Sequence, residues 1–264
     1  MSLLLAFPGW RLLSPSSSRV ASWRALGKGS GFCARAGWSF IEGFRRISSV
    51  KFPEIRTAVI EAFRLLEERG VNWAYSGNIS VRLPEEGLYL ISPSGFWKSR
   101  MRPEDLVVID ENGNLVEGSR KPSIEYRMHL ALYRSRSDIN AIVHAHPLYA
   151  SVFAALRKRV EPLLEELVLY LGGPVEVAEY ALPGTEELAQ KVLKALGDRN
   201  AVLLANHGAL TCGSSLEEAV AAMVYLERAA AVSVLATLLG GAHPLPDEAV
   251  KLEREIYLAK RGIA

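Results

Sequence analysis

Three histidines form the clearest chemical pattern in this sequence. His144 and His146 stand two positions apart in the apolar stretch INAIVHAHP, and side-chain alternation along a strand would put both imidazoles on one face. His207 follows the apolar run AVLLA and precedes a glycine, so we expect it at a strand end that is open to solvent. Three imidazole nitrogens with a free fourth position are typical of a catalytic zinc site, although other divalent metals accept the same ligands.

Ordinary hydrogen-bonded histidines are the alternative interpretation, and it suits any single histidine or isolated H-x-H pair. The chain has five histidines, however, and three of them stand at the ends of two apolar segments that we expect to be neighbouring strands. His129, inside the helical segment YRMHLALY, is expected to be structural, and His243, in the loop GAHPLP, is expected to be exposed. Neither joins the predicted metal site.

Glu125 stands near the start of segment 123–136, which has a helical pattern. An acidic residue in the first turn of a helix is usually explained by the helix dipole alone. Beside a metal, however, a carboxylate serves as a ligand or as a general base, and it can change between the two roles when substrate arrives. Position along the chain does not decide between these interpretations.

Three short segments have the composition of anion-binding turns. SGNIS contains Asn78, and SPSG contains Ser94 and Gly95, beside which backbone N–H groups can approach an anion closely. Ser123, just before the predicted helix, adds a hydroxyl to the free N–H groups of a helix start. Each segment alone is explained as a turn or a cap, and only their occurrence together with the histidines predicts a phosphate site.

The order of the expected elements indicates the scaffold that positions these residues. Apolar side chains at helical spacing predict a first helix over 51–70, and short segments rich in β-formers then predict an antiparallel meander. Strands followed by helices, with no repeats, indicate one α/β domain of three layers. The predicted strands are SVRL, GLYLIS, LVVID, INAIVHAH, VEVAEY and AVLLANHG, and the later helices are LYASVFAAL, TEELAQKVLKALG and SLEEAVAAMVYLERAAAVSVLATLLG.

Composition argues against several classes of protein. Hydrophobic residues make up 49% of the 264 residues, and no uninterrupted apolar run approaches the roughly 18 residues of a membrane helix. A formal net charge of +2, without a basic stripe, argues against a nucleic-acid partner. Cys33 and Cys212 stand far apart, so they indicate neither a disulfide framework nor a cysteine metal site. They favour a reducing compartment, the cytoplasm.

Residues 1–50 differ from the rest of the chain. They carry seven arginine or lysine residues against the single acid Glu42, with serine and glycine throughout. A targeting segment, a disordered tail and sequence upstream of the true start all fit this composition. We favour the last, because the amphipathic pattern begins directly after Val50, a residue that a GTG start codon would encode. Residues 51–264 are then the single folded domain.

Six short motifs occur in a fixed order along the body, and together they resemble the class II aldolase and adducin-head family. The similarity runs from Phe52 to Leu239 and looks greatest to the fuculose-phosphate aldolase branch. The 19 positions from Glu125 to His144 and the 61 from His146 to His207 are similar to the spacings of that branch. The motifs are GNIS at 77–80, SPSG at 92–95, PSIE at 122–125, HAHP at 144–147, PGT at 183–185 and NHG at 206–208.

The resemblance implies a fold, an assembly and an activity. The fold is a central, mainly antiparallel sheet flanked by helices, and the assembly is a homotetramer with active sites between subunits. The activity is zinc-dependent cleavage of a ketose 1-phosphate, similar to L-fuculose 1-phosphate, into dihydroxyacetone phosphate and an aldehyde such as L-lactaldehyde. The implied zinc ligands are His144, His146, His207 and Glu125, with Glu125 also the acid/base, and the implied phosphate site is Asn78, Ser94, Gly95 and Ser123.

Two places depart from the pattern of that branch. Ile124 stands where the fuculose enzyme has a second serine, so one phosphate-binding hydroxyl is missing. Near LLEELVLYLGG the family places a tyrosine that protonates the leaving aldehyde in a neighbouring subunit's site, whereas Glu165 or Glu166 stands there in this chain. Tyr257 is a candidate for that role, although packing explains it equally well.

Three other functions share this scaffold. Ribulose-5-phosphate 4-epimerases typically carry Asp where Glu125 stands, which favours an aldolase here. Methylthioribulose-1-phosphate dehydratases place their catalytic glutamate elsewhere, and the spacing counts against them as well. Adducin-like interaction domains lose the zinc ligands, whereas all three histidines are present in this chain.

Overall fold

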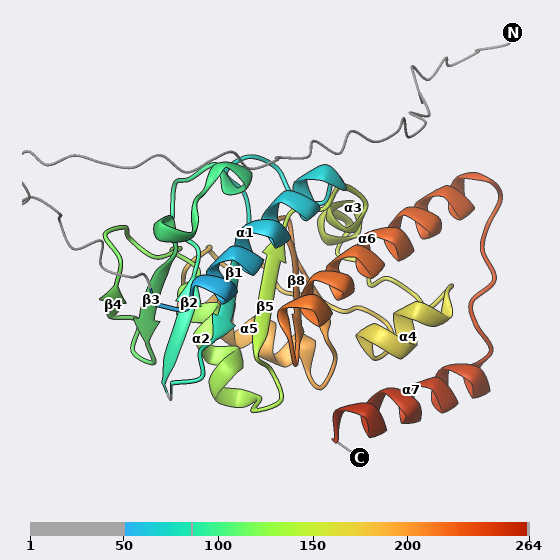
Figure 1. Cartoon of the computed structure of the whole chain (residues 1–264). Helices are drawn as coiled ribbons and strands as arrows, with labels where there is room; N and C mark the ends of the chain where they lie inside the picture. Colours follow the sequence, from blue (N-terminus) through green and yellow to red (C-terminus); the bar gives the residue numbers. More distant parts are fainter. Residues whose placement is uncertain (1–50, 86, 263–264) are drawn as a thin grey trace, which may run out of the picture. The chain divides into compact units, whose positions relative to one another are not determined.

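A computed structural model describes residues 51–85 and 87–262 of the chain (Figure 1). All of these residues belong to one compact unit, Ser49–Ala264. The expectations for residues 1–50, including a start upstream of the true one, lie outside the described residues.

A single eight-stranded sheet forms the centre of the domain, with strand order β4-β3-β2-β1-β5-β8-β7-β6. Every pair of neighbours is antiparallel except β6 and β7, which are parallel. This confirms the mainly antiparallel sheet. The strands are β1 (Asn78–Arg82), β2 (Leu88–Ile91), β3 (Val107–Asp110), β4 (Leu115–Glu117), β5 (Ala141–Ala145), β6 (Val177–Ala178), β7 (Ala201–Leu204) and β8 (Gly208–Gly213).

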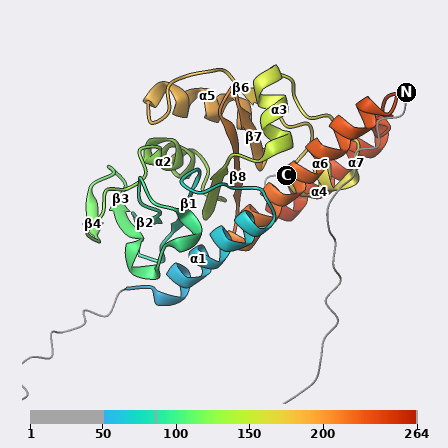
Figure 2. The same ribbon diagram turned by 90° about the horizontal axis from the view of Figure 1, so that it is seen from above.

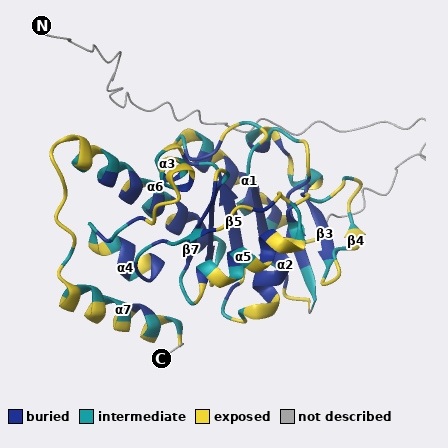
Figure 3. Cartoon of the chain, turned by 180° about the vertical axis from the view of Figure 1, so that it is seen from behind, coloured by how far each residue is buried: buried dark blue, intermediate teal, exposed yellow. Residues whose placement is uncertain are grey.

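Helices cover both faces of the sheet, which confirms the three-layer α/β architecture (Figure 2). One core cluster joins side chains of α1, α3, α4 and α6 to one face, and a second joins α2 and α5 to the other. The central strands are coloured as buried in the view from behind (Figure 3), and every residue of β5, β7 and β8 is buried. The helices are α1 (Pro53–Glu68), α2 (Tyr126–Ser135), α3 (Leu148–Leu156), α4 (Glu165–Leu171), α5 (Glu186–Leu196), α6 (Leu216–Leu238) and α7 (Asp247–Arg261), with short 3-10 helices η1 (Lys98–Arg100) and η2 (Pro103–Asp105).

Local signals account for where the longer helices begin. Pro53 opens α1, a position that needs no donor N–H. Thr185 caps α5 by accepting a hydrogen bond from Leu188 N–H at 3.2 Å, and Ser215 caps α6 by accepting one from Glu218 N–H at 3.2 Å. These caps fix the chain direction on either side of the strands β7 and β8.

The long helix α6 is apolar enough, by length and composition, to cross a membrane, with a mean hydropathy of 1.6. Its apolar stretch is interrupted by Glu227 and Arg228, in agreement with the sequence expectation that no such run is continuous. The side chains of Ala219, Met223 and Leu226 are buried in the core beside the sheet. Packing on β5 and β8 therefore accounts for the composition of α6.

Several elements differ from the expectation, and among them β4, α4 and α7 were not predicted. The segment VEVAEY forms only the two-residue strand β6, and the residues after His207 form β8, a full strand that the sequence pattern did not indicate. Because β8 lies between β5 and β7, the strands that carry the histidines are not direct neighbours. The chain turns tightly at His207, so β8 pairs with β7 on one side and with β5 on the other.

Candidate metal centre and active site

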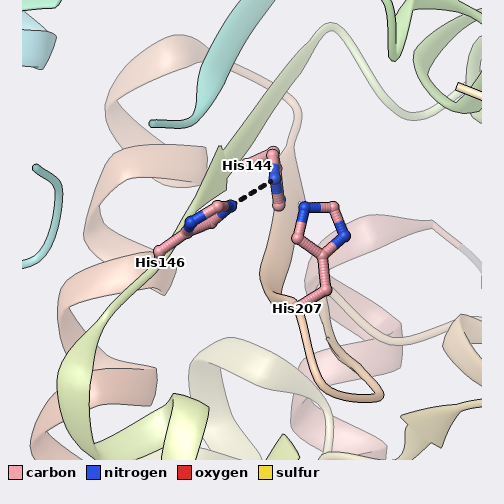
Figure 4. Close-up of side chains that lie close together, drawn as sticks. All are labelled: His144, His146 and His207. Atoms are coloured by element: carbon pink, nitrogen blue, oxygen red, sulfur yellow. Dashed lines mark hydrogen bonds between the residues drawn. The ribbon is translucent and has the colours of Figure 1, made fainter. Parts of the chain in front are cut away.

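The imidazoles of the three histidines point toward one another (Figure 4). His144 is in β5, His146 follows the end of that strand, and His207 lies in the turn between β7 and β8. One ligand nitrogen from each ring lies within 4.8 Å of the others, and the Nε2 atoms of His144 and His146 are 3.1 Å apart. The fold thus gathers three potential metal ligands from two parts of the chain.

His144 is held in one tautomer by the sheet. Its Nδ1 lies 2.8 Å from the carbonyl oxygen of Ala209 in β8, and a carbonyl only accepts hydrogen bonds, so Nδ1 carries the proton. Nε2 is then the free nitrogen that faces the cluster. Metal-binding histidines are commonly oriented in this way by a carbonyl behind the ring.

Glu125 reaches the same cluster from the N-terminal cap of α2, where it is only 6% exposed. Its Oε2 lies 3.3 Å from His144 Nε2, and its Oε1 lies 3.6 Å from His207 Nε2. Asn78 in β1 donates a hydrogen bond to Oε2 at 2.8 Å. Burial raises the pKa of the Glu125 carboxyl, but His144, His207 and the Asn78 amide outweigh it, so the pKa lies below its ordinary value.

The donor atoms fit a divalent cation. Glu125 Oε1, which faces His207 Nε2, is buried without a hydrogen-bond partner in the described chain. Burial, with a smaller contribution from the neighbouring His144 ring, lowers the pKa of His146 to about 3 and that of His207 to about 4, so both rings are neutral at neutral pH. Neutral imidazoles and a carboxylate are the ligand forms that zinc and similar metals require.

A pocket of about 200 Å³ opens beside the cluster. Its lining brings together Asn78, Ser94, Gly95 and Ser123, the four residues expected to hold a phosphate. Ser123 is buried and its hydroxyl accepts a hydrogen bond from Glu125 N–H at 3.4 Å, whereas Ser94 and Gly95 are exposed at the mouth. The pocket also reaches His146 and His207. Small polar groups and potential metal ligands therefore face one cavity.

Comparison with known proteins shows the family of the chain. Residues 57–234 match the Class II Aldolase and Adducin N-terminal domain. The chain belongs to this family. It is accordingly an enzyme, a lyase of the metal-dependent class II aldolase type.

Named relatives cover most of the body. A 5-deoxy-D-ribulose 1-phosphate aldolase of Bacillus thuringiensis is 36% identical over 193 residues, 73% of this chain and 90% of the relative. A 5-methylthioribulose-1-phosphate/5-deoxyribulose-1-phosphate aldolase of Rhodospirillum rubrum is 38% identical over 67% of this chain and 78% of its own length. A solved L-fuculose 1-phosphate aldolase is 40% identical with a TM-score of 0.73, covering 76% of this chain and 95% of that structure.

Two glycines of the family motifs are explained by close approach of the backbone. A Cβ on Gly77 would lie 2.5 Å from the carbonyl oxygen of His144, and its φ of +75° also favours glycine. A Cβ on Gly208 would lie 2.6 Å from the carbonyl oxygen of Ala145 and 2.7 Å from the His146 ring. Both glycines let the ligand-bearing strand β5 approach its neighbours closely.

His129 has a larger part in the site than its sequence context indicated. It does not join the metal cluster, as expected, but its Nε2 lies 2.5 Å from Asn78 Oδ1. Its Nδ1 lies 2.7 Å from Ser80 Oγ, which in turn lies 2.8 Å from the Tyr133 hydroxyl. Because the Asn78 amide nitrogen donates to Glu125, its oxygen must accept from His129, and a buried hydrogen-bond chain thus orients Glu125. Only the position of His129 opposite β1 reveals this role.

The residues considered for protonating the leaving aldehyde lie elsewhere in the described chain. Glu165 and Glu166 are in the first turn of α4, and Glu166 forms an ion pair with Arg228 at 3.0 Å. Tyr257 is buried in α7, and its hydroxyl donates to the carbonyl oxygen of Asp198 at 3.0 Å. None of the three lines the pocket beside the histidines.

Proposed function

We propose that the protein cleaves a ketose 1-phosphate to dihydroxyacetone phosphate and an aldehyde, with zinc held by His144, His146, His207 and Glu125. The observation that carries this proposal is the buried Glu125 carboxylate, which faces two imidazoles while one of its oxygens lacks a partner. L-Fuculose 1-phosphate and 5-deoxyribulose 1-phosphate are the candidate substrates. Both contain the dihydroxyacetone-phosphate half and differ in the aldehyde that is released.

In this mechanism Asn78, Ser94, Gly95 and Ser123 bind the phosphate and so fix the reacting carbons beside Glu125. A bound divalent cation supplies Lewis-acid stabilisation of negative charge on the substrate oxygens. When the C3–C4 bond breaks, the C4 hydroxyl gives up its proton and becomes the aldehyde carbonyl, while the electron pair of the bond stays with the dihydroxyacetone-phosphate half. Glu125, which is ionised at rest, takes up the released proton and delivers it to C3. The Asn78 amide keeps the carboxylate in position for this transfer.

The test is a cleavage assay on the purified, zinc-loaded protein. Fuculose, 5-deoxyribulose, rhamnulose and methylthioribulose 1-phosphates are supplied separately, alongside ribulose 5-phosphate, and dihydroxyacetone phosphate is measured. We expect its release from at least one ketose 1-phosphate and its loss on treatment with a chelator. Activity that survives removal of the metal contradicts the mechanism, and turnover of ribulose 5-phosphate alone, without a cleavage product, favours an epimerase.

We also propose a homotetramer in the cytoplasm. Leu238 and Leu239, at the C-terminal end of α6, are 76% and 88% exposed, and an apolar surface of this kind is typical of a subunit contact. A separate apolar groove lies between α1 and the first half of α6, lined by Leu65, Val220 and Val224. Light scattering coupled to size exclusion measures the assembly directly, and a monomer contradicts the proposal.

A further inference from the structure

Lys98 is a buried lysine at the edge of the candidate active site. It begins η1 and is only 2% exposed, although lysine is almost never buried without a partner. Its backbone N–H donates to Ala74 at 2.7 Å, and its ammonium donates to the carbonyl oxygen of Pro93 at 2.7 Å. The second contact holds the side chain against the SPSG turn.

The ammonium of Lys98 can donate more hydrogen bonds than it forms. A lysine ammonium has three N–H groups, and one hydrogen bond of Nζ is formed within the described chain. No carboxylate oxygen of the described residues lies within 4.0 Å of Lys98 Nζ, the distance limit for an ion pair. A buried cation without a counterion is unfavourable, so an anion bound beside Lys98 would offset the cost of burying its charge.

The charged residues in the pocket lining also indicate that an anion would bind beside Lys98. Among the described residues that line it, Lys98 is the one lysine or arginine, and Glu125 is the one with a carboxylate. Asn78, Ser94 and Ser123 are neutral hydrogen-bonding groups, and Gly95 contributes only backbone. Without Lys98 a phosphate dianion would enter this part of the pocket with no fixed positive charge beside it.

We propose that Lys98 binds the substrate phosphate, its ammonium donating charge-assisted hydrogen bonds to the oxygens that Ser94, Gly95 and Ser123 also contact. The inference rests on the proposed function, since it assigns the counter-charge of the same phosphate. A binding lysine at this position compensates for the hydroxyl that Ile124 lacks. Hydrogen bonds between charged partners are about twice as strong as neutral ones.

The protonation of Lys98 is consistent with this role. Burial lowers the pKa of the Lys98 ammonium to about 8, and the negative charge of Glu125 opposes the shift. The cation therefore predominates at neutral pH. A phosphate dianion beside it would raise the pKa again, because a nearby opposite charge favours the charged form.

Binding of a simple phosphate monoester tests the proposal without requiring turnover. Methyl phosphate is titrated into the metal-loaded protein by calorimetry at about pH 7.5, where a phosphate monoester is mainly a dianion. Lys98→Met is expected to raise the Kd about thirtyfold, because a hydrogen bond to a charged group is lost. Lys121→Met is the matched control, since that lysine is exposed, and its Kd should stay within about twofold of the wild-type value.

Two comparisons distinguish the effect of losing the Lys98 charge from the effect of displacing the SPSG turn. Lys98→Gln retains a donor for the Pro93 carbonyl but removes the charge, so it should lose affinity as Lys98→Met does. Methyl sulfate is a monoanion, so both variants should lose less affinity for it than for methyl phosphate. Unchanged binding of methyl phosphate by folded Lys98→Gln overturns the proposal, and so does an equal loss for both anions.

Thermal unfolding shows whether the variants are folded. If neither folds, a crystal structure of the wild-type protein with methyl phosphate decides, because an anion bound away from Lys98 Nζ overturns the inference. Failure of the proposed function has a different signature: the wild-type protein would cleave no ketose 1-phosphate, while the charge-dependent loss of methyl phosphate binding would persist. Cleavage by the wild type, with unchanged phosphate binding in both variants, would reject only the role of Lys98.

Discussion

Strand β5 has a cluster of ionisable side chains near each end. Before its first residue, Asp138 accepts hydrogen bonds from Arg136 at 2.5 Å and from Arg261 of α7, and Arg261 also reaches Glu218 at 3.1 Å. At its other end, His144 and His146 meet His207 and Glu125. Both clusters are partly or fully buried, and both join segments that are distant in the sequence.

The two clusters differ in how their charges are balanced. Near the start of β5, two guanidinium groups face two carboxylates, so the positive and negative charges compensate one another. At the end of the strand, one carboxylate faces three imidazoles, with no arginine or lysine paired to it, and its Oε1 lacks a hydrogen-bond partner within the described residues. A balanced cluster stabilises the fold by itself, whereas the second cluster offers its free ligand atoms to a cation. We therefore assign structure to the first and chemistry to the second.

Replacement of Glu125 by glutamine is expected to have the largest effect on activity. Glutamine retains the shape but cannot transfer a proton, so cleavage should fall by about a thousandfold. Release of dihydroxyacetone phosphate from the preferred ketose 1-phosphate measures the change. Asp138→Asn is the matched control from the other end of β5, and its activity should stay within about twofold of wild type. A Glu125→Gln protein that keeps a tenth of the wild-type activity would contradict the assignment of chemistry to the cluster that contains Glu125.

Replacement of His146 by alanine is expected to weaken zinc binding by more than about a hundredfold, because even groups that only orient a ligand contribute 10- to 100-fold. Competition with a fluorescent chelator measures the affinity. His243→Ala is the control, since His243 is exposed in the loop before α7. Equal zinc affinity in the two variants would show that the three imidazoles do not act as a metal site.

Replacement of His129 by phenylalanine is expected to lower kcat about tenfold, with KM changed by less than about threefold. The ring volume is kept, but Asn78 loses the donor that fixes its amide, so Glu125 is less well oriented. Steady-state kinetics separates kcat from KM, and zinc content controls for loss of the metal. Tyr133→Phe, at the far end of the same hydrogen-bond chain, should have a smaller effect. A rise in KM alone would contradict the positioning role.

Replacement of Asp138 by asparagine should change stability rather than activity. Burial raises the pKa of Asp138, but Arg136 and Arg261 outweigh it and hold the pKa well below its usual value. The ion pairs therefore stabilise the fold above the unfolded-state pKa of about 4, and this contribution is lost as pH falls toward the folded-state value. Urea unfolding should show Asp138→Asn to be less stable by about 1–2 kcal/mol at neutral pH. The difference should shrink in acid, and a difference independent of pH would contradict the assignment.

Local patterns were enough to predict much of the scaffold. The spacing of apolar residues predicted α1, α5 and α6, because one buried helical face imposes that period. The pairing of His144 with His146, and the position of His207 beyond an apolar run, likewise follow from strand alternation and strand ends. Ser94, Gly95 and Ser123 have turn and cap compositions that any single segment displays, and their shared pocket became visible only in the folded chain.

What the sequence by itself determined is the set of chemical groups and their local geometry: imidazoles at strand ends, a carboxylate at a helix start, and serines and glycines in turns. Tertiary structure alone decided that β8 lies between β5 and β7, that His129 supports Asn78, and that Lys98 is buried at the pocket. These features depend on strand register and on contacts between residues far apart in the chain. Periodicity reports which face of a segment is buried, but not which distant segment covers it.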